Sequence, residues 1–443
     1  MTRASPRLPR LWRHSILIPA AVLAGLGGAG CAHRSAGPAA APPSAGAVTV
    51  YEMEPIRITA VTDPDGTHVE AYDAADLFEQ GGKALSEKRY DDAIRAYDRV
   101  LTEFRDSRYT QSALYNVGLA YLGKKDWSGG IERFRALTDG YPDSGDAKDA
   151  AFQLGASFAE IGNWPASVQV FSQVLDRKDL SSYDRLEAMA RRGFAQFQLK
   201  DLETAERTLR SAVAFFRQTE SLERFETDFY LALAMYHLGQ ISHERFRAVE
   251  LRLPEDRMGA DLEEKAHLLL TSQRQYIDTI KLGNPGWASA SGFQIASLYE
   301  ELYDCFIHAP VPPDLLKPEA HEKLDVYYQE VRKKIRILLE KSVRTHEANL
   351  AMMERLGVQN EWKEKSKLAY AKIQRLLDPS YRADFETAAT GGGGPSAPAE
   401  SPSLPRAPAS RWQGPPEPAA PIKEDEDRGP KPRPSEGPVR QIM

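Results

Sequence analysis

Few residue clusters in this sequence have the types and spacing that enzyme or metal chemistry requires. Histidine precedes glutamate at His243, His321 and His346, but no second histidine follows four residues after any of them. The helical two-histidine zinc site is therefore absent. Gly81-Gly82-Lys83 lacks the upstream glycine and the hydroxyl residue of a phosphate-binding loop, and no Gly-x-Ser-x-Gly motif occurs. We expect a non-catalytic protein with no metal, no cofactor and no small-molecule substrate.

The two cysteines, Cys31 and Cys305, are too few for a disulfide framework. Cys305 and His308 could share one face of a helix, but two ligands without a further cluster do not make a metal site. We interpret Cys305 as a small core residue rather than a nucleophile.

The charge of the chain argues against a nucleic-acid partner. Its 443 residues include 57 Lys and Arg against 63 Asp and Glu, a net charge of −6. DNA or RNA binding needs a basic surface, because the protein must neutralise phosphates. A hydrophobic content of 42% with 27% charged residues also excludes a multi-span membrane protein.

Residues 1–30 have the order of a secretory signal peptide. An arginine-bearing start is followed by the apolar run 15–26 and then by small residues. The apolar run is shorter than the roughly 20 residues that span a bilayer. Cys31, directly after Gly27-Gly28-Ala29-Gly30, resembles the lipid-attachment cysteine of bacterial lipoproteins, although Gly28 stands where leucine is usual.

This resemblance implies that residues 1–30 are removed and that Cys31 carries the lipid. Ala32 follows, where an aspartate would suggest retention in the inner membrane. We therefore expect a lipid anchor in the outer membrane, with the chain mainly facing the periplasm. A surface-facing orientation stays open.

A repeat of 37 to 38 residues begins near residue 72. Small residues stand at Gly81, Gly118, Gly155 and Gly193, and matching positions recur around each of them. Four residues before stand Leu77, Leu114, Ala151 and Met189; sixteen after stand Tyr97, Phe134, Phe171 and Leu209. Such units cannot bury their apolar faces alone and must stack.

The pattern resembles the tetratricopeptide repeat over about residues 74–216. A fifth, degenerate unit is expected from Ala232, although its second helix fits the pattern poorly. The resemblance implies an all-α solenoid over residues 72–250, with about four to five repeats. It also implies a groove, lined by the first helix of each pair, that binds an apolar helix or an extended peptide. We expect the groove to be lined by Phe78, Tyr115, Leu119, Phe152, Phe194 and Phe197. The alternative is that these rings pack against the neighbouring repeat.

Further amphipathic helices are expected over residues 251–378. In the first of them, one expected apolar face carries Leu262, Ala266, Leu269, Gln273, Ile277 and Ile280. Residues 379–443 are proline-rich and are expected to be disordered. Residues 31–71 are expected to be a lipidated tether. Within it, residues 48–60 are either a short strand that pairs with a partner edge or an extended linker.

Together these features predict a non-catalytic outer-membrane lipoprotein scaffold that binds proteins of an envelope-spanning complex. The segment around Trp287-Ala-Ser-Ala-Ser-Gly-Phe293 is similar to large tetratricopeptide proteins of myxobacteria, and that resemblance implies gliding motility. The alternatives are outer-membrane protein assembly and coordination of the cell wall or of division. The sequence names neither the partners nor the oligomeric state.

Overall fold

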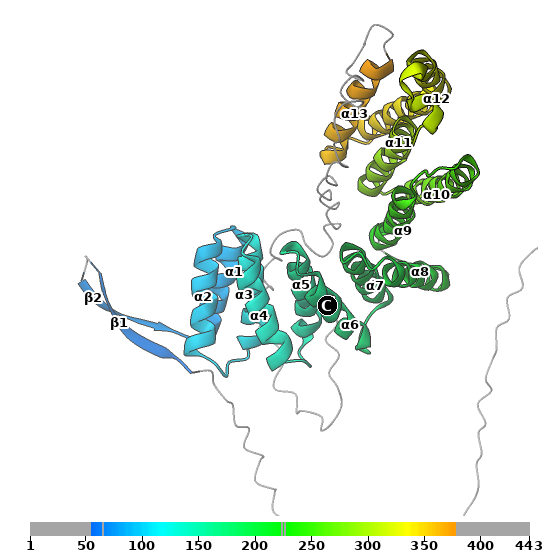
Figure 1. Cartoon of the computed structure of the whole chain (residues 1–443). Coiled ribbons are helices and arrows are strands. Elements are labelled where there is room, and N and C mark those ends of the chain that lie inside the picture. Colours follow the sequence, from blue (N-terminus) through cyan, green and yellow to red (C-terminus); the bar gives the residue numbers. More distant parts are fainter. Residues whose placement is uncertain (1–54, 64–65, 223–224, 226, 378–443) are drawn as a thin grey trace, which may run out of the picture. The chain divides into compact units, whose positions relative to one another are not determined.

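The computed structural model describes residues 55–63, 66–222, 225 and 227–377 (Figure 1). The expected signal peptide, the lipidation at Cys31, most of the tether and the proline-rich tail lie outside the described residues. Within them the predicted fold class is confirmed: an all-α solenoid of helix pairs, followed by further helices.

Four helix pairs occupy the region in which the repeat was found, and each helix packs against the next (Figure 1). The pairs are α1 (Ala74–Ser86) with α2 (Tyr90–Glu103), α3 (Thr110–Gly123) with α4 (Trp127–Gly140), α5 (Gly145–Glu160) with α6 (Trp164–Asp176), and α7 (Ser182–Gln198) with α8 (Leu202–Thr219).

Each pair closes on the glycine that marks the repeat. A Cβ atom placed on Gly81, Gly118, Gly155 or Gly193 would lie 2.6 to 2.8 Å from an atom of the side chain sixteen residues later. The glycine therefore admits the facing ring, or the leucine in the fourth unit, where any larger residue would clash. Seven residues after each glycine the turn between the helices uses a positive φ, at Lys88, Lys125, Gly162 and Lys200.

The fifth unit is α9 (Phe229–Ala248) with α10 (Glu255–Lys281), and it repeats this contact across a longer connection. A Cβ on Gly239 would lie 2.7 Å from the ring of Tyr276, on α10. The Ser272 hydroxyl donates to the Gly239 carbonyl at 2.8 Å, just as Ser167 donates to Gly155 at 2.9 Å in the third unit. The second helix is thus in the repeat register.

The prediction of an apolar stripe on α10 is wrong. Of its six residues only Leu269 is buried, whereas Ala266 and Ile277 are exposed. The buried face of α10 is largely polar and carries Asp261, Lys265, Ser272, Tyr276 and Thr279. Polar residues are stable there because they bond to neighbouring groups, and hydrophobic periodicity does not detect such a face.

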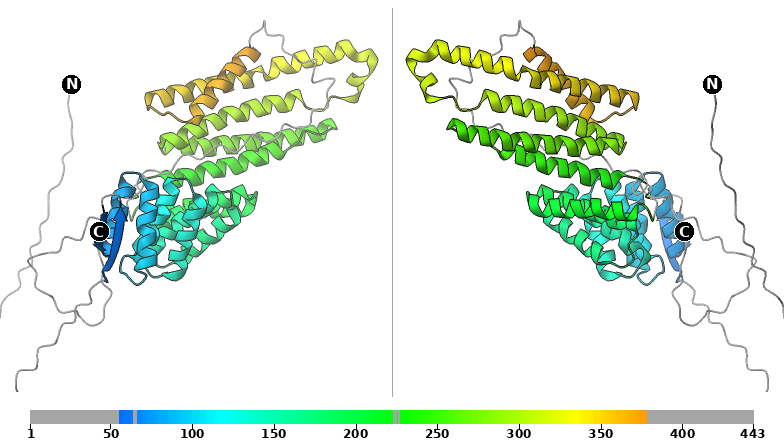
Figure 2. Two further views of the ribbon diagram at one scale, coloured as in Figure 1. Left: turned by 90° about the vertical axis from the view of Figure 1, so that its left-hand side faces the viewer. Right: turned by 90° about the vertical axis from the view of Figure 1, so that its right-hand side faces the viewer.

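Three more helices complete the described chain: α11 (Pro285–Ile307), α12 (His321–Arg355) and α13 (Glu361–Leu377) (Figure 2). Two short 3₁₀ turns, Pro313–Leu316 and Pro318–Ala320, join α11 to α12. The start of α11 is made of small residues around Trp287, and it is buried because α9, α10, α12 and α13 all contact this helix.

A β-hairpin precedes the helices. Strand β1 (Arg57–Asp63) pairs antiparallel with β2 (Gly66–Tyr72), and Ile58 lies opposite Ala71. β1 overlaps only the end, residues 57–60, of the stretch 48–60 in which a strand was considered, and its partner is β2 of the same chain rather than another protein.

Candidate functional site

The residues expected to line an open groove lie mostly inside the solenoid. Leu119, Phe152, Phe194 and Phe197 keep only 1 to 7% of their surface exposed, so the structure places these four side chains in the packing between helices. Phe78 and Tyr115 are half-buried. The alternative reading, that the rings pack between repeats, describes them better.

Packing against the next unit explains the burial of the two phenylalanines on α7. The rings of Phe194 and Phe197 lie 4.8 and 5.5 Å from the imidazole of His237 on α9, measured between centroids. They follow Gly193 by one and four residues, so they share a helical face beside the closest helix approach. That spacing was a signal in the sequence that this face is interior.

His237 is itself a core residue that the sequence reasoning missed. Its ring lies within 5.9 Å of Trp287 and 5.1 Å of Tyr236, and its Nδ1 lies 2.8 Å from the Leu233 carbonyl oxygen. Burial lowers the pKa of His237 to about 4, and the bond to the carbonyl only partly offsets that effect. The imidazole is therefore neutral at pH 7.

Hydrogen bonds and ion pairs join the first helices of successive units. The Ser112 hydroxyl donates to Asp146 at 2.8 Å, and Lys148 pairs with the buried Asp184 at 3.0 Å. Farther along, Arg191 bonds Glu187 at 2.9 Å and the Tyr230 hydroxyl at 3.1 Å. These contacts fix the units relative to one another instead of leaving charges free for catalysis.

A depression of about 530 Å³ lies between α4, α5 and α6, and we call it the α4–α6 depression. Its floor includes Phe158 and Val170, which are buried, and its rim includes exposed Arg135 and Gln173. The guanidinium carbon of Arg135 lies 5.5 Å from the centroid of the Phe158 ring. An apolar floor with a polar rim suits a side chain of a partner protein.

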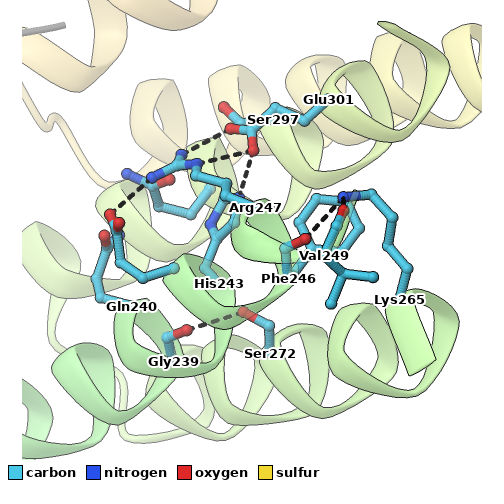
Figure 3. Close-up of polar contacts among 12 residues, drawn as sticks. Gly239, Gln240, His243, Phe246, Arg247, Val249, Lys265, Ser272, Ser297 and Glu301 are labelled. Atoms are coloured by element: carbon cyan, nitrogen blue, oxygen red, sulfur yellow. Dashed lines mark hydrogen bonds and ion pairs between the residues drawn. The ribbon is translucent and has the colours of Figure 1, made fainter. Parts of the chain in front are cut away.

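A cluster of polar side chains joins α9, α10 and α11 (Figure 3). Arg247 forms two hydrogen bonds to the Glu301 carboxylate, at 2.8 and 2.6 Å. His243 bonds the same carboxylate through Nε2 at 3.1 Å, and its Nδ1 lies 3.2 Å from the Tyr276 hydroxyl. These distances fit a neutral imidazole that donates to Glu301 and accepts from Tyr276.

The electrostatics of this cluster agree with that proton arrangement. Burial lowers the pKa of His243 despite the nearby carboxylate. Burial alone would raise the pKa of Glu301, but hydrogen bonds from Arg247 and His243 outweigh it and bring that pKa to about 2. Glu301 is thus ionised and His243 neutral at pH 7.

The order Tyr276, His243, Glu301 resembles a proton relay, but only its outer member, Glu301, borders a pocket, and the two inner members are sealed from solvent. Tyr276 and His243 are 0% exposed. Every polar atom of the three finds a partner within the cluster. These bonds brace three helices against one another.

A shallow pocket of about 410 Å³ borders the cluster and is lined by Lys265, Cys305 and His308, among others. The Lys265 ammonium donates to the carbonyls of Phe246 and Val249 at 2.7 and 2.9 Å (Figure 3). It thereby caps the C-terminal end of α9, where a cation is favourable. Burial raises the pKa of the half-buried Cys305 thiol.

The described ranges contain no group of three or more His, Cys, Asp or Glu side chains placed to hold a metal ion. Among the histidine–glutamate neighbours, His346 bonds Glu300 instead of Glu347, at 3.0 Å, and Glu244 pairs with Arg247. No helix of the described chain is long and apolar enough to cross a bilayer.

Comparison with known proteins supports the repeat. Residues 112–144, which cover most of α3 and α4, match the tetratricopeptide repeat family. No curated protein matches the sequence.

Several solved structures are similar at low identity. A crystal structure of MamA is 14% identical and covers 47% of this chain and 94% of its own, with a TM-score of 0.34. MamA from Desulfovibrio magneticus RS-1 is 16% identical and covers 46% and 98%, with a TM-score of 0.31. A Podospora anserina protein with nearly identical TPR-like repeats of the kinesin light chain kind is 13% identical and covers 45% and 96%, with a TM-score of 0.33. The chain carries a tetratricopeptide repeat within a helix-pair solenoid, the architecture of a protein–protein interaction scaffold.

Proposed function

We propose that this protein is a non-catalytic scaffold whose solenoid holds partner proteins of the cell envelope. The observation that carries the proposal is the same close contact between glycine and facing side chain in five successive helix pairs. It gives a stiff array that presents fixed surfaces, which is what a binding scaffold needs. The complete burial of Tyr276 and His243 supports a structural role for their cluster.

The proposal includes the lipid anchor at Cys31 and a location in the outer membrane, mainly facing the periplasm. The support is the sequence of residues 1–32, which lie outside the described residues. An anchored scaffold acts by raising the local concentration of the proteins that it binds. For the process we propose gliding motility, on the sequence similarity around Trp287. Outer-membrane protein assembly and coordination of the cell wall or of division are the alternatives.

The surface that we propose to test first is the α4–α6 depression, because the rings once expected to line a groove are interior. Replacing Phe152 would unfold the unit rather than report on binding, since this ring packs on Phe171 inside the core. Arg135 is exposed on the rim, and a change there removes only its contact with the face of the Phe158 ring and leaves the core intact.

The experiment is affinity purification of the full-length protein from its native membranes, followed by mass spectrometry of the retained proteins. Arg135→Glu is compared with Arg207→Glu, which makes the same charge change at an exposed position of α8 away from the depression. We expect a fixed set of envelope proteins with the native chain and with Arg207→Glu, and a reduced set with Arg135→Glu.

Retention of no specific protein by the native chain would refute the scaffold function. Equal retention by both variants would refute the α4–α6 depression as the contact surface. A Cys31→Ala variant tests the anchor separately, because it should leave the outer-membrane fraction. The identities of the retained proteins choose among the three processes.

A further inference from the structure

Basic side chains concentrate on the last two described helices. Residues 330–344 of α12 and 361–377 of α13 contain eleven Lys and Arg against four Glu. Residues 74–320 have the opposite balance, with 30 Lys and Arg against 39 Asp and Glu. Like charges held together repel one another and lower stability, so the concentration on α12 and α13 indicates an anionic partner.

The two basic segments lie side by side because they share a small core. Ile335 and Leu339 on α12 and Ile373 on α13 are buried together with Tyr303 and Ile307 on α11. The two helices pack against each other, as the yellow and orange helices of Figure 2 show. The cations of both helices thus surround one core and form one surface, which we call the α12–α13 basic surface.

The four glutamates do not neutralise the α12–α13 basic surface. Each pairs with one cation of its own helix at 2.8 to 3.8 Å: Glu330 with Lys333, Glu340 with Arg336, Glu361 with Lys365 and Glu364 with Lys367. Asp304 of α11 offsets part of the charge of Lys372. Lys334, Arg344 and Arg375 are exposed, and no acid among the described residues forms an ion pair with them.

An exposed aliphatic side chain lies among the cations on each helix. Spacings of three or four residues place these side chains on one face of their helix: Lys334, Ile337, Lys341 and Arg344 on α12, and Leu368, Lys372 and Arg375 on α13. Ile337 is 48% exposed and Leu368 is 73% exposed. The anionic partner must therefore also accommodate apolar side chains.

We propose that the α12–α13 basic surface binds an anionic membrane surface, with its cations at the lipid phosphates and Ile337 and Leu368 in the apolar layer beneath. A bilayer offers both layers at successive depths. An acidic protein segment would satisfy the charges but would leave the two aliphatic side chains beside carboxylates. Seven of the eleven cations are lysines, whose flexible ammonium groups suit a diffuse layer of headgroups, whereas arginine is preferred for paired recognition of one carboxylate.

This inference goes beyond the scaffold function and does not depend on the anchor proposed at Cys31. A lipid anchor holds only one point of the chain at the membrane. A second contact through α12 and α13 would also set how the solenoid lies on that membrane, at about 1 kcal/mol for each cation near an anionic surface.

The test is cosedimentation with lipid vesicles. The protein used is residues 32–443, which keeps every described element and leaves out the expected signal peptide and lipid-attachment cysteine, because these would bind vesicles by themselves. We expect at least about tenfold tighter binding to phosphatidylcholine vesicles with about 30% phosphatidylglycerol than to phosphatidylcholine alone. Raising the salt from about 50 to about 300 mM should remove the difference, because salt screens the charges.

Two variants test the residues of the α12–α13 basic surface. The triple variant Lys334→Glu, Arg344→Glu, Arg375→Glu should weaken binding to the anionic vesicles at least about tenfold. Leu368→Ser should weaken it about threefold or more without changing its salt dependence, since only the apolar contact is lost. Unchanged midpoints of urea denaturation show that both variants keep the fold.

The matched control is the triple variant Arg207→Glu, Arg217→Glu, Arg274→Glu. It makes the same change of net charge at exposed positions of α8 and α10. Its affinity for the anionic vesicles should stay within about threefold of the native value, because these positions lie on other helices.

Equal binding of the native chain to neutral and anionic vesicles would overturn the proposal, and so would equal losses in the two triple variants. An unchanged affinity of Leu368→Ser would overturn the insertion of this side chain into the bilayer. If the chain ignores anionic vesicles while the first triple variant retains fewer proteins in affinity purification, the surface binds an acidic protein instead of lipid. The scaffold function is decided separately, by the proteins that the native chain retains.

Discussion

At the scale of single residues, the close glycine contacts decide how the helices pair. Gly239 admits the Tyr276 ring, and a Cβ there would lie 2.7 Å from a ring carbon. We expect Gly239→Ala to lower the free energy of unfolding by about 1 to 3 kcal/mol, the usual cost of overpacking. The measurement is urea denaturation. Gly259→Ala is the control: it lies on α10 with no atom within 4 Å of an added Cβ, so it should raise stability by about 0.5 to 1 kcal/mol. Equal effects of the two changes on stability would contradict the close contact between Gly239 and the Tyr276 ring.

The buried imidazole of His237 makes stability depend on pH. Because burial lowers its pKa to about 4, the folded chain binds fewer protons than the unfolded chain once the pH falls below 6.5. The contribution of the neutral His237 ring to the free energy of unfolding is fully present above pH 6.5. It is lost progressively as the pH falls to about 4, where the loss reaches about 3 kcal/mol. His237→Phe should remove this part of the pH dependence. Urea denaturation of both proteins at pH 7, 5.5 and 4.5 gives the comparison, and parallel pH profiles would refute it.

At the scale of elements, the regular units were predictable and the irregular ones were not. Four pairs are visible in the sequence because glycine and the facing side chain stand sixteen residues apart, a spacing set by two short helices and a tight turn. In the fifth unit the same contact spans Gly239 to Tyr276, so a fixed period misses it. The buried face of α10 was also missed. Hydrogen bonds, rather than hydrophobic side chains, stabilise this face, so a hydrophobic pattern does not detect it.

The candidate site was less predictable than the fold. Periodicity correctly placed Phe194 and Phe197 on the first helix of a pair, but it cannot distinguish a face that lines a groove from one that meets the next unit. That difference depends on His237 and Trp287, which lie about 40 and 90 residues farther along the chain. The α4–α6 depression likewise depends on three helices at once, and no local pattern marks it.

The matching hydrogen bonds of Ser167 and Ser272 test whether α9 and α10 form a true repeat unit. Each hydroxyl is buried and donates to the carbonyl of the interlocking glycine. We expect Ser167→Ala and Ser272→Ala each to cost about 1 kcal/mol of unfolding free energy in urea titrations, despite the different lengths of their units. Ser211→Ala, at an exposed position of α8, should change stability by less than about 0.5 kcal/mol. If Ser272→Ala alone left the free energy of unfolding unchanged, α9 and α10 would not form a true repeat unit.

At the scale of the whole described chain, the hydrophobic core is unevenly divided. One cluster runs from Leu186 on α7 to Trp362 on α13, and two smaller clusters belong almost wholly to α1 to α6. A fourth, smaller cluster joins α11, α12 and α13 around Tyr303 and Leu339. In a stack of units, the free energy of unfolding is approximately the sum of the stability of each unit and of its interfaces with the neighbouring units. Helices that share one large core therefore unfold together, and a terminal unit with a small core opens first. We therefore expect amides of α1 and α2 to exchange through openings of lower free energy than amides of α9 and α11. Native-state hydrogen exchange at increasing urea concentration measures these free energies helix by helix. One common value for all helices would show that the chain unfolds as a single unit, and a lower value for α9 than for α1 would reverse the order that the clusters imply.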